Sequence, residues 1–400
     1  MYELGRRTVS NEARRERDRR RTGADPAARV FNMAEIELAI DAHLPEWPSR
    51  RDWGVGVVGA GFIVRDCHLP AYRDAGFRVA AITSRTESRA REVAEARGVP
   101  RVHRTVEALL DDPEVEVVDV AVPPAEQPGV IRRILNHPRK VRGILAQKPL
   151  ALSLAEAREL VDACEAAGVV LQVNQNMRYD QSVRALRWLL DRRVLGDPVL
   201  ATIEMRAIPH WMPWARDGRS LSTFIMSIHH LDTLRYWLGE PERVLASTRP
   251  DPRTTFPHVD GINLVILEYA DGARASSWDD VWAGPAREGA AAELGVRWRF
   301  EGTEGLALGT IGWPAWPRRE PSTIAYATRA DEGKWRRPHW PQSWFPDAFA
   351  GPMAGLLRAI ETGAPADISG RDNLNTIALC EAVLAAATEH RVVGFDEFHV

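Results

Sequence analysis

Hydrophobic and polar positions follow two different rhythms along the chain, and the first covers residues 53 to 173. Short apolar runs suited to buried strands recur there, and amphipathic stretches of helical period follow them. The apolar runs lie at 53–58, 78–83, 115–122, 143–146 and 169–173, and the helical stretches at 66–75, 86–97, 130–137 and 153–167. Strands that alternate with helices at this spacing predict an α/β domain built on a doubly wound parallel sheet.

The second rhythm begins after residue 196, where apolar and polar residues alternate. Strand-like alternation lies at 199–206, 243–248, 262–269, 274–278 and 296–300, and helical periodicity at 227–238, 352–362 and 372–389. Strands that come in runs predict an α+β domain with a large, mostly antiparallel open sheet. We therefore expect a flexible N-terminal extension at 1–50, the α/β domain at 51–173 and the α+β domain at 174–400.

The composition narrows the classes of function. The chain has 400 residues, is 45% hydrophobic and carries a net charge of −3. This balance argues against a nucleic-acid-binding protein, because neutralising phosphates needs a clear surplus of Lys and Arg. A run of about 18 apolar residues that could span a membrane is missing from the sequence. Because Cys67, Cys164 and Cys380 lie too far apart for a disulfide framework or a zinc finger, we expect a cytoplasmic protein.

The first thirty residues differ in charge from the rest. They carry nine Arg and five acidic residues, a net charge of +4, which leaves −7 for residues 31–400. Residues 14–21 have no apolar face, and the region lacks the apolar core of a secretory signal peptide. Because acidic residues interrupt the basic ones, a solvated tail, with Met33 as the true start, is favoured over an arm for nucleic acid or anionic lipid.

The first apolar run leads into a glycine-rich turn and then into a helix. Gly59 permits the bend, and Gly61 lets a pyrophosphate approach the backbone where the helix begins with Phe62 and Ile63. Val64 stands where a third small residue is usual, so the helix must lie slightly further from the strand. A tight turn without any ligand shows the same two glycines, and the turn alone is therefore weak support for nucleotide binding.

The end of the second strand is where a dinucleotide-binding fold contacts the adenosine ribose. Ser84 and Arg85 lie there, about 23 residues beyond Gly61, whereas an Asp or Glu would bind a free 2′-hydroxyl. A hydroxyl and a guanidinium suit a 2′-phosphate, so we expect NADP(H) in preference to NAD(H). The alternative is that Arg85 is a solvated residue at the start of the next helix.

Four short segments carry candidate motifs. They are Gly59-Ala-Gly61-Phe-Ile with His68-Leu-Pro-Ala, Gln147-Lys148-Pro149, Asn174-Gln-Asn176-Met-Arg178-Tyr179, and Ser227-Ile-His229-His-Leu-Asp232. Together they resemble the motifs of the Gfo/Idh/MocA oxidoreductases, which join a Rossmann domain to an open β-sheet domain. Each is weak alone, but they keep a family-like order and spacing over about 340 residues, from Trp53 to Val393.

The resemblance implies an NAD(P)-dependent oxidoreductase with two catalytic residues. Lys148, at a strand end, would bond both the substrate oxygen and the nicotinamide ribose, and burial would lower its pKa. His229 is the natural base. A surface position for Lys148 is the alternative. The cofactor-binding residues expected at the strand ends are Gly59, Gly61, Phe62, Ile63, Ser84, Arg85, Pro123, Pro124, Gln147, Lys148 and Asn176.

The sequence departs from the family pattern most clearly at Ile225. Many members have an Asp there, four residues before the histidine, that pairs with it one helical turn on. Asp232, three residues beyond His229, is one candidate to orient the ring instead, although its usual role looks structural. The other departures are Gln147 for Glu, Pro123-Pro124-Ala125 for Thr-Pro-Asn, Pro128 near a usual His, and Ser227 for Gly.

Adjacent histidines raise the question of a metal. His229 and His230 point in different directions on one helix and do not converge on one ion, so we expect no metal cofactor and a packing role for His230.

Charged and aromatic residues near the strand ends could line the substrate side, because sugar-like ligands are held by such groups. Ordinary packing in the sheet or at an interface is the alternative for each of them. The candidates are Arg178, Tyr179, Arg206, His210, Trp211 and Asp232.

Tryptophan is concentrated in the second half, with twelve of fourteen at or after Trp188. The segment 312–345 is rich in Trp, Pro and Arg and has little regular pattern. A segment of this kind is typical of a lid or an interface arm, or of a surface insertion that packs on its own aromatic rings.

We expect a dehydrogenase or reductase that acts on a hydroxyl or ketone of a sugar, cyclitol or sugar acid. One face of the open sheet would cover the nicotinamide, and the other would pair with further copies in a dimer or tetramer, with no nucleic-acid or membrane partner. A redox-neutral isomerase or glycoside-cleaving enzyme that keeps its cofactor is the second hypothesis, because of Ile225. A non-catalytic nucleotide sensor is the third, because of Val64 and Ile225.

Overall fold

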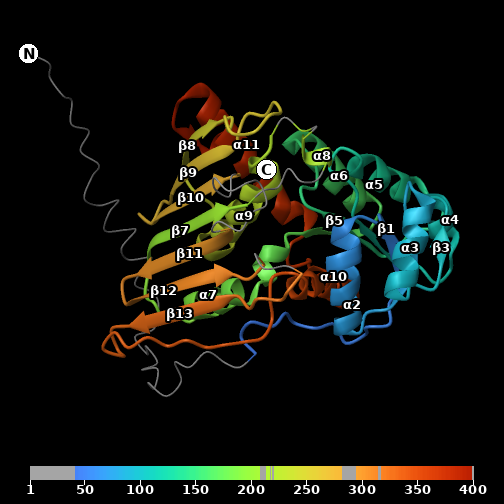
Figure 1. Cartoon of the computed structure of the whole chain (residues 1–400), viewed down its shortest axis with the longest axis horizontal. Helices are drawn as coiled ribbons and strands as arrows, with labels where there is room; N and C mark the ends of the chain where they lie inside the picture. The colour runs from blue at the N-terminus through green and yellow to red at the C-terminus, as the bar shows by residue number, and fades with distance from the viewer. Residues whose placement is uncertain are drawn as a thin grey trace, which may run out of the picture. The chain divides into compact units, whose positions relative to one another are not determined.

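Six strands form a parallel sheet in the first half of the chain. A computed structural model describes residues 41–207, 213–216, 218, 220–281, 294–313 and 317–398. The strand order is β3-β2-β1-β4-β5-β6, and every neighbouring pair is parallel (Figure 1), which confirms the predicted α/β architecture. The strands are β1 (Val55–Val58), β2 (Val79–Thr83), β3 (Val102–His103), β4 (Val117–Val120), β5 (Gly143–Gln147) and β6 (Val170–Asn174).

Helices pack on both faces of this sheet. One face shares a core with α2, α3 and α10, in which Val57 of β1 and Leu356 of α10 are both buried. On the opposite face Gly56 lies against Leu109 of α4, and α5 and α6 follow beside α4. The helices are α2 (Leu69–Ala75), α3 (Glu87–Arg97), α4 (Val106–Asp111), α5 (Gln127–Asn136), α6 (Leu154–Ala166) and α10 (Ala350–Thr362).

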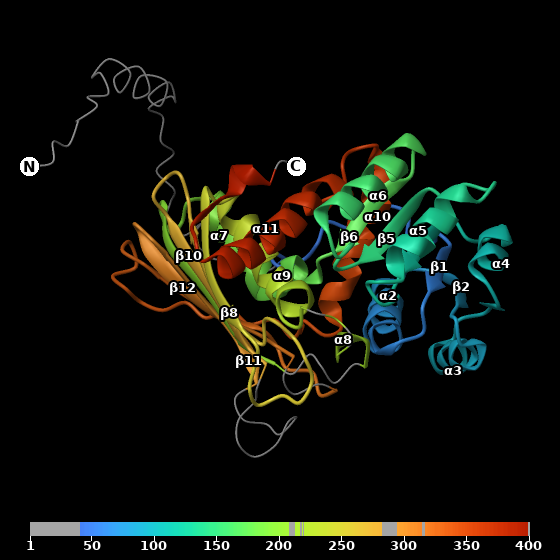
Figure 2. The ribbon, with the colours of Figure 1, turned by 90° about the horizontal axis from the view of Figure 1, so that it is seen from above.

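The helix α10 packs on the first sheet although it comes from far along the chain. Its residues belong to the region assigned to the second domain, yet Leu356 and Ile360 pack against Gly143 of β5. Both ribbon views show α10 beside β5 (Figures 1 and 2). A hydrogen bond also joins the two elements: Nε2 of Gln172 in β6 donates to the carbonyl of Pro352 in α10 at 2.6 Å. The first sheet therefore depends on a helix that follows β6 by about 180 residues.

Eight strands form the second sheet, in the order β13-β12-β11-β7-β10-β9-β8-β14. Each neighbouring pair is antiparallel except β7 and β10, which are parallel, so the predicted mostly antiparallel sheet is confirmed. The strands are β7 (Pro198–Arg206), β8 (Arg243–Arg249), β9 (Ile262–Glu268), β10 (Arg274–Asp280), β11 (Gly295–Gly302), β12 (Gly305–Ile311), β13 (Thr323–Thr328) and β14 (Val393–Gly394).

Helices cover one face of the second sheet, as Figure 2 shows. On that face the Trp237 ring of α9 meets the Trp298 ring of β11 edge-on, with 5.3 Å between the ring centres. On the other face Leu264 and Ile266 of β9 are 50% and 48% exposed. The remaining elements are α7 (Gln181–Asp191), α8 (Pro213–Arg216), α9 (Ile228–Leu238), α11 (Gly370–Glu389), the π-helical turns η2 (Val64–His68) and η5 (Thr223–Ser227), and the 3-10 turns η3 (Asn176–Tyr179), η6 (Asp347–Phe349) and η7 (Phe395–Glu397).

Several elements are absent from the sequence prediction. The helix α7 was missed although Asp180 caps it, accepting from the backbone N–H groups of Ser182 and Val183. The strands β3, β12 and β13 and the helix α4 are absent too. Of these, β3 and α4 have two and six residues, too few periods to recognise. The expectation of little regular structure over 312–345 is wrong at β13, which pairs with β12.

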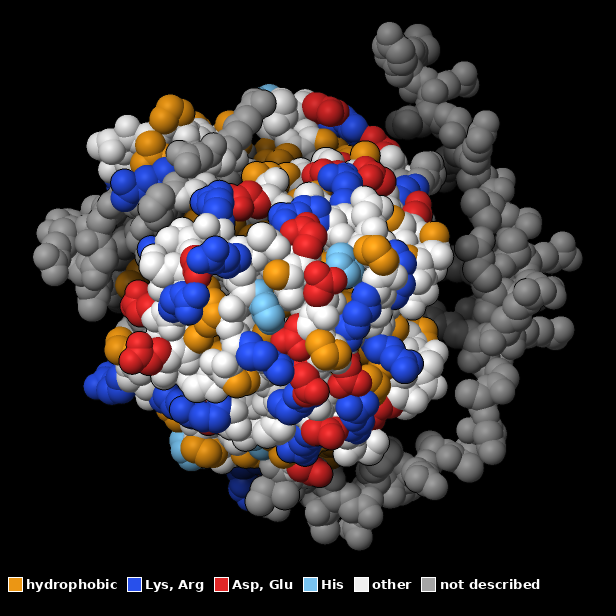
Figure 3. Space-filling view, turned by 90° about the vertical axis from the view of Figure 1, so that its right-hand side faces the viewer, with side chains coloured by type: hydrophobic (Ala, Val, Ile, Leu, Met, Phe, Trp, Pro, Cys, Tyr) orange, Lys and Arg blue, Asp and Glu red, His pale blue; other side chains and the backbone are white. Residues whose placement is uncertain are grey.

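Charges on the end of the molecule that carries α3 and α4 are interspersed rather than segregated (Figure 3). Arg133 of α5 lies 2.7 Å from Glu107 of α4, and Arg91 and Glu87 pair at 2.5 Å within α3. Exposed pairs of this kind contribute little to stability. In the described part of the chain, no helix has both the length and the apolar character needed to cross a membrane.

Candidate functional site

The turn after β1 is shaped by two glycines with different surroundings. Gly59 has a φ of +126°, and a Cβ there would lie 2.2 Å from the carbonyl oxygen of Ala121, so only glycine fits. Beside Gly61, by contrast, a Cβ would meet no atom within 4 Å. The backbone at Gly61 therefore lies open, as a turn that receives a pyrophosphate requires.

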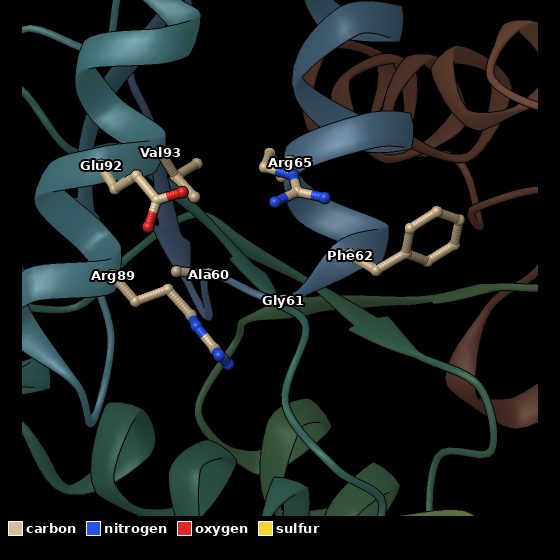
Figure 4. Close-up of a pocket in the computed structure, with 7 residues that line it drawn as sticks. All are labelled: Ala60, Gly61, Phe62, Arg65, Arg89, Glu92 and Val93. Carbon is tan, nitrogen blue, oxygen red and sulfur yellow. The ribbon is translucent and has the colours of Figure 1, made fainter. Parts of the chain in front are cut away.

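A cavity of about 260 Å³ opens beside this turn (Figure 4). Figure 4 shows Arg65 of η2 and Arg89 of α3 reaching toward it from opposite sides. Both are cations that the sequence analysis did not select. The cavity is lined by Ala60, Gly61, Phe62, Arg65, Arg89, Glu92 and Val93.

The two residues expected to contact the ribose lie after β2. Ser84 is half-buried, and its Oγ accepts a hydrogen bond from the backbone N–H of Thr86 at 3.3 Å. Arg85 is exposed and forms an ion pair with Glu126, with 2.5 Å between Nη1 and Oε1. Arg85 is thus held by a carboxylate, which competes with any phosphate for its guanidinium.

The other expected cofactor residues line the same edge of the sheet. The carbonyl of Pro123 accepts from the N–H groups of Glu126 and Gln127, so Pro123 and Pro124 form the turn between β4 and α5. Ile63 is half-buried against the first core, and the Phe62 ring lies 6.3 Å from the ring of Phe345.

Lys148 follows β5 and reaches toward the second half of the chain. Its Nζ donates to the backbone carbonyl of Ile225 in η5. Gln147 supports the turn, because its Oε1 accepts from the N–H of Lys148 at 2.8 Å. Burial lowers the pKa of Lys148 from 10.5 to about 7, since the charged ammonium loses its hydration.

His229, on α9, lies close to Lys148. It is 3% exposed, and burial, reinforced by the charges of Lys148 and His230, lowers its pKa well below the usual 6.5. Its Nδ1 is buried without a hydrogen-bond partner among the described residues. The structure thus brings together the two residues chosen as catalytic, and His229 is neutral at pH 7.

Ile225, which stands where many family members have an Asp, takes part in the site through its backbone carbonyl. It lies in the π-helical turn η5, whose start is held by Asp260, which accepts from the N–H groups of Leu221 at 2.5 Å and Thr223 at 2.7 Å. The Ile225 carbonyl then takes the hydrogen bond from Lys148. A carbonyl, unlike a carboxylate, adds no negative charge that would keep the lysine protonated.

Asp232, one candidate to orient His229, forms its hydrogen bonds with other residues. Both carboxylate oxygens of Asp232 accept from Arg178, at 2.6 and 2.7 Å, and Thr376 donates to one of them at 2.8 Å. The Nη2 of Arg178, which bonds Asp232, also lies 3.0 Å from Oδ2 of Asp372. Arg178 and Asp232 are buried at 7% and 1% exposure. They join η3, α9 and α11. Because their polar atoms are hydrogen-bonded to one another, they are not available to bind a substrate.

Two further substrate candidates lie away from Lys148 and His229. The Tyr179 hydroxyl donates to Asp367 at 3.0 Å, and its ring packs on Gly351 of α10. Arg206 lies on the outward face of the second sheet, where its guanidinium is 5.7 Å from the Trp278 ring. The alternation of β7 explains this, because Met205 takes the buried face. His210 and Trp211 lie outside the described residues.

His230 faces the second sheet, as a packing role requires. Its Nδ1 lies 3.0 Å from the hydroxyl of Ser277 and 3.1 Å from Asp279, both on β10. Across the described residues, His, Cys, Asp and Glu side chains nowhere gather in a group of three or more that could hold a metal ion.

An aromatic wall that the sequence analysis left unassigned borders His229. The ring of Trp344 stands edge-on to the imidazole, with 5.3 Å between centres and an interplanar angle of 90°. Its Nε1 donates to Oδ1 of Asn176 at 2.6 Å. Trp313 and Phe345, both half-buried, extend the wall at 6.3 and 4.7 Å from Trp344. In the sequence, this wall is indicated only by the many tryptophans of 312–345, and that composition does not show that Trp344 contacts His229.

Comparisons with known proteins agree with this geometry. Residues 53–175 match the description "Oxidoreductase family, NAD-binding Rossmann fold", and residues 183–308 match the Gfo/Idh/MocA C-terminal domain. The chain is 27% identical over 355 residues to the D-apiose dehydrogenase of Paraburkholderia graminis, covering 84% of this chain and 88% of that protein. It is 24% identical to the myo-inositol 2-dehydrogenase of Thermotoga maritima, covering 86% and 98%.

The fold has solved counterparts. One is an oxidoreductase from Agrobacterium radiobacter in complex with NAD+, L-tartaric acid and magnesium, with a TM-score of 0.72 at 21% identity, covering 86% of this chain and 99% of that one. Another is the aldose-aldose oxidoreductase from Caulobacter crescentus complexed with glycerol, with a TM-score of 0.72 at 22% identity, covering 86% and 100%. With both halves of the fold matched in order, the chain belongs to the Gfo/Idh/MocA family of NAD(P)-dependent oxidoreductases.

Proposed function

We propose that this protein transfers a hydride between nicotinamide and a hydroxyl-bearing carbon of a sugar, cyclitol or sugar acid. The observation that carries the proposal is the meeting of Lys148, whose Nζ bonds the carbonyl of Ile225, with the buried His229 at the carboxyl edge of the first sheet. Ligands bind at this edge in doubly wound sheets. The names of relatives support the substrate class, since they include D-apiose, D-xylose 1- and myo-inositol 2-dehydrogenases.

The chain's own contribution to oxidation is to remove a proton. A bound nicotinamide would supply the hydride acceptor. As the carbon–hydrogen bond breaks and the carbonyl forms, the hydroxyl proton moves to the Nζ of Lys148. A pKa of about 7 leaves about half of the amine free to accept it at neutral pH. The ammonium then formed is poorly solvated, so it returns its proton to water or, in reduction, to the substrate oxygen.

His229 would hold the same oxygen or its neighbour. A neutral imidazole presents one N–H donor and one acceptor nitrogen, which suits a hydroxyl that must donate to Lys148 and accept elsewhere. The half-buried rings of Trp313 and Phe345 would pack on the C–H face of the substrate ring. We therefore assign substrate contact to these two rings and to His229, in place of Arg178, Tyr179, Arg206 and Asp232.

The cavity beside Gly61 supports NADP(H) in preference to NAD(H). Arg89 of α3 borders it, as does Arg65, which pairs with Asp66 at 2.8 Å, and Ser84 lies at the end of the adjacent strand. Arginine binds phosphate through charge-assisted hydrogen bonds, whereas a free 2′-hydroxyl calls for a carboxylate. Because Arg85 is paired with Glu126, we transfer the principal phosphate contact to Arg89.

The outward face of the second sheet supports a homo-oligomer. Leu264 and Ile266 are exposed side by side on β9, and Leu245 of β8 lies opposite Ile266 on the same face. A contiguous apolar sheet face that is exposed in one copy is stabilised by a second copy. The three cysteines are free and buried, which supports a reducing compartment such as the cytoplasm.

Replacing the catalytic lysine tests the assignment. Lys148→Met should lower kcat by more than about tenfold while the cofactor affinity, measured by calorimetry, changes little, because the amine acts on the substrate proton. Lys140→Met is the matched control, since Lys140 bonds the carbonyl of Leu135 on the α5 side. A Lys148→Met variant that turns over a sugar panel normally rejects the assignment.

The pH profile should report the same group. The rate of alcohol oxidation should rise with pH and level off above about pH 7, as Lys148 loses its proton. The pKa of Lys148 is about 7 in the folded state and 10.5 in the unfolded state, so between these two pH values the folded state binds fewer protons. The free energy of unfolding should therefore increase as the pH rises from 7 to 10.5. The chain has only three lysines, Lys140, Lys148 and Lys334, so NMR of ¹³Cε-labelled lysine reads each directly. If all three lysine signals titrate with a pKa near 10.5, the lowered pKa of Lys148 is contradicted.

Cofactor choice is tested on α3. Arg89→Ala should weaken NADP+ binding by about 10- to 100-fold, the value of one or two charge-assisted hydrogen bonds, and leave NAD+ binding unchanged. Arg91→Ala is the control on the same helix, because Arg91 pairs with Glu87 instead. Equal loss of affinity for both cofactors, or none for either, would remove the phosphate role.

The sheet interface is tested by mass in solution. Light scattering should give the mass of a dimer or tetramer for the wild type and of a monomer for Leu264→Arg, because burying a guanidinium on an apolar face is costly. Leu152→Arg changes an equally exposed leucine in the first half and should keep the oligomer. A wild-type protein that is monomeric at micromolar concentration would refute the interface.

A further inference from the structure

A fully buried histidine and aspartate lie beneath the candidate active site. His68 ends η2, and Asp119 interrupts the apolar strand β4; both are 0% exposed. The Nδ1 of His68 lies 2.6 Å from Oδ2 of Asp119, and the Tyr72 hydroxyl donates to that same oxygen at 2.8 Å. A carboxylate in the middle of a buried strand is costly unless its partners are fixed.

The carboxylate determines which ring nitrogen of His68 carries a proton. Nδ1 faces Asp119 and donates, and Nε2 accepts, because the groups that approach it are amide N–H donors. Two side-chain amides converge on Nε2. They are Nδ2 of Asn174 at 3.0 Å and Nε2 of Gln147 at 3.3 Å. The other ring tautomer would present a hydrogen to both amides and break both contacts.

One of these amides leads to Lys148. Gln147 donates to His68 through Nε2 and accepts from the backbone N–H of Lys148 through Oε1, at 2.8 Å. The carboxamide therefore bridges the buried ring and the residue that carries the amine. Its orientation is fixed by both ends, because a flipped amide would face the wrong atom at each.

The other amide leads to the aromatic wall. Asn174 accepts from Nδ2 of Asn176 at 3.3 Å, and Oδ1 of Asn176 accepts from Nε1 of Trp344 at 2.6 Å. Trp344 stands edge-on to His229. A single histidine thus connects, through hydrogen bonds on both sides, to the lysine turn and to the ring that packs on the second catalytic residue.

We propose that the His68–Asp119 pair positions the active site, holding the Lys148 turn through Gln147 and the Trp344 ring through Asn174 and Asn176. The proposal rests on the proposed catalytic roles of Lys148 and His229. Neither His68 nor Asp119 contacts the substrate, so both act through other residues. Around metal-binding histidines, partners that fix the tautomer contribute about 10- to 100-fold in function, and we take the lower end of that range as the expected effect here.

Two substitutions of His68 separate its two nitrogens. In His68→Asn the amide reaches the Nδ1 position and keeps a donor to Asp119, but the acceptor at Nε2 is lost. In His68→Gln the longer side chain can restore an acceptor near Nε2. We expect His68→Asn to lower kcat by about tenfold or more with cofactor affinity retained, and His68→Gln to recover part of that loss.

Tyr72→Phe is the matched control. It removes a buried hydrogen bond to the same Asp119 oxygen but leaves the His68 acceptor in place. We expect a similar loss of thermal stability in Tyr72→Phe and His68→Asn, with kcat changed by less than about threefold in the former. Equal kcat in the two variants would overturn the proposal.

A measurement independent of turnover is the pKa of Lys148, read from ¹³Cε-labelled lysine. His68→Asn should move it from about 7 toward 10.5, because the loosened turn lets water reach the amine, while Tyr72→Phe should not. An unshifted value in folded His68→Asn overturns the proposal. If Lys148→Met proves fully active, the proposed function fails, yet this shift still tests the positioning. If His68→Asn does not fold, Gln147→Leu is the substitute, because Gln147 is half-buried and joins His68 to the Lys148 turn. An unshifted pKa of Lys148 in Gln147→Leu would equally overturn the proposal.

Discussion

The hydrogen bond from the Nζ of Lys148 to the backbone carbonyl of Ile225 joins the two halves of this molecule at the point where chemistry is proposed. The lysine comes from the edge of the parallel sheet, and the carbonyl comes from the π-helical turn that precedes α9. Because burial removes hydration from the ammonium and the acceptor is uncharged, the amine loses its proton easily, and the neighbouring imidazole stays neutral. A carboxylate at 225 would have favoured the ammonium instead.

Such a contact needs a rigid setting, and buried ion pairs provide it. Arg178 is held between Asp232 and Asp372, and Arg235 binds Glu240 and Asp372 beside it. These charges come from η3, from α9 and the residues just after it, and from α11, and each is compensated by a partner within hydrogen-bond distance. Because the two arginines are buried and each lies between two carboxylates, the cluster constrains how α9 lies relative to the end of the first sheet. That placement carries His229 to Lys148.

The aromatic residues of the second half serve a related purpose. Trp344 is fully buried and bonded to Asn176, whereas Trp313 and Phe345 keep part of their rings exposed. The first stabilises the wall and the others leave a surface for a ligand. Polar networks below the site and aromatic rings above it thus limit both the water that can enter and the shape that can bind.

The sequence by itself determined what depends on neighbouring residues: the alternation of strands and helices, the bend at Gly59, the turn that carries Lys148, and the family motifs that selected His229. It could not determine partners remote along the chain. Arg178 finds Asp232 54 positions away and Asn176 finds Trp344 168 positions away, so residues read as substrate ligands proved to be spent on one another. Arg206 turned outward because a strand sends alternate side chains to opposite faces, and only the packing of α9 decided which face is inside. Local pattern fixes conformation within a few residues, whereas contacts that close long loops are chosen by the whole fold, which alone decides which side chains remain available for a substrate.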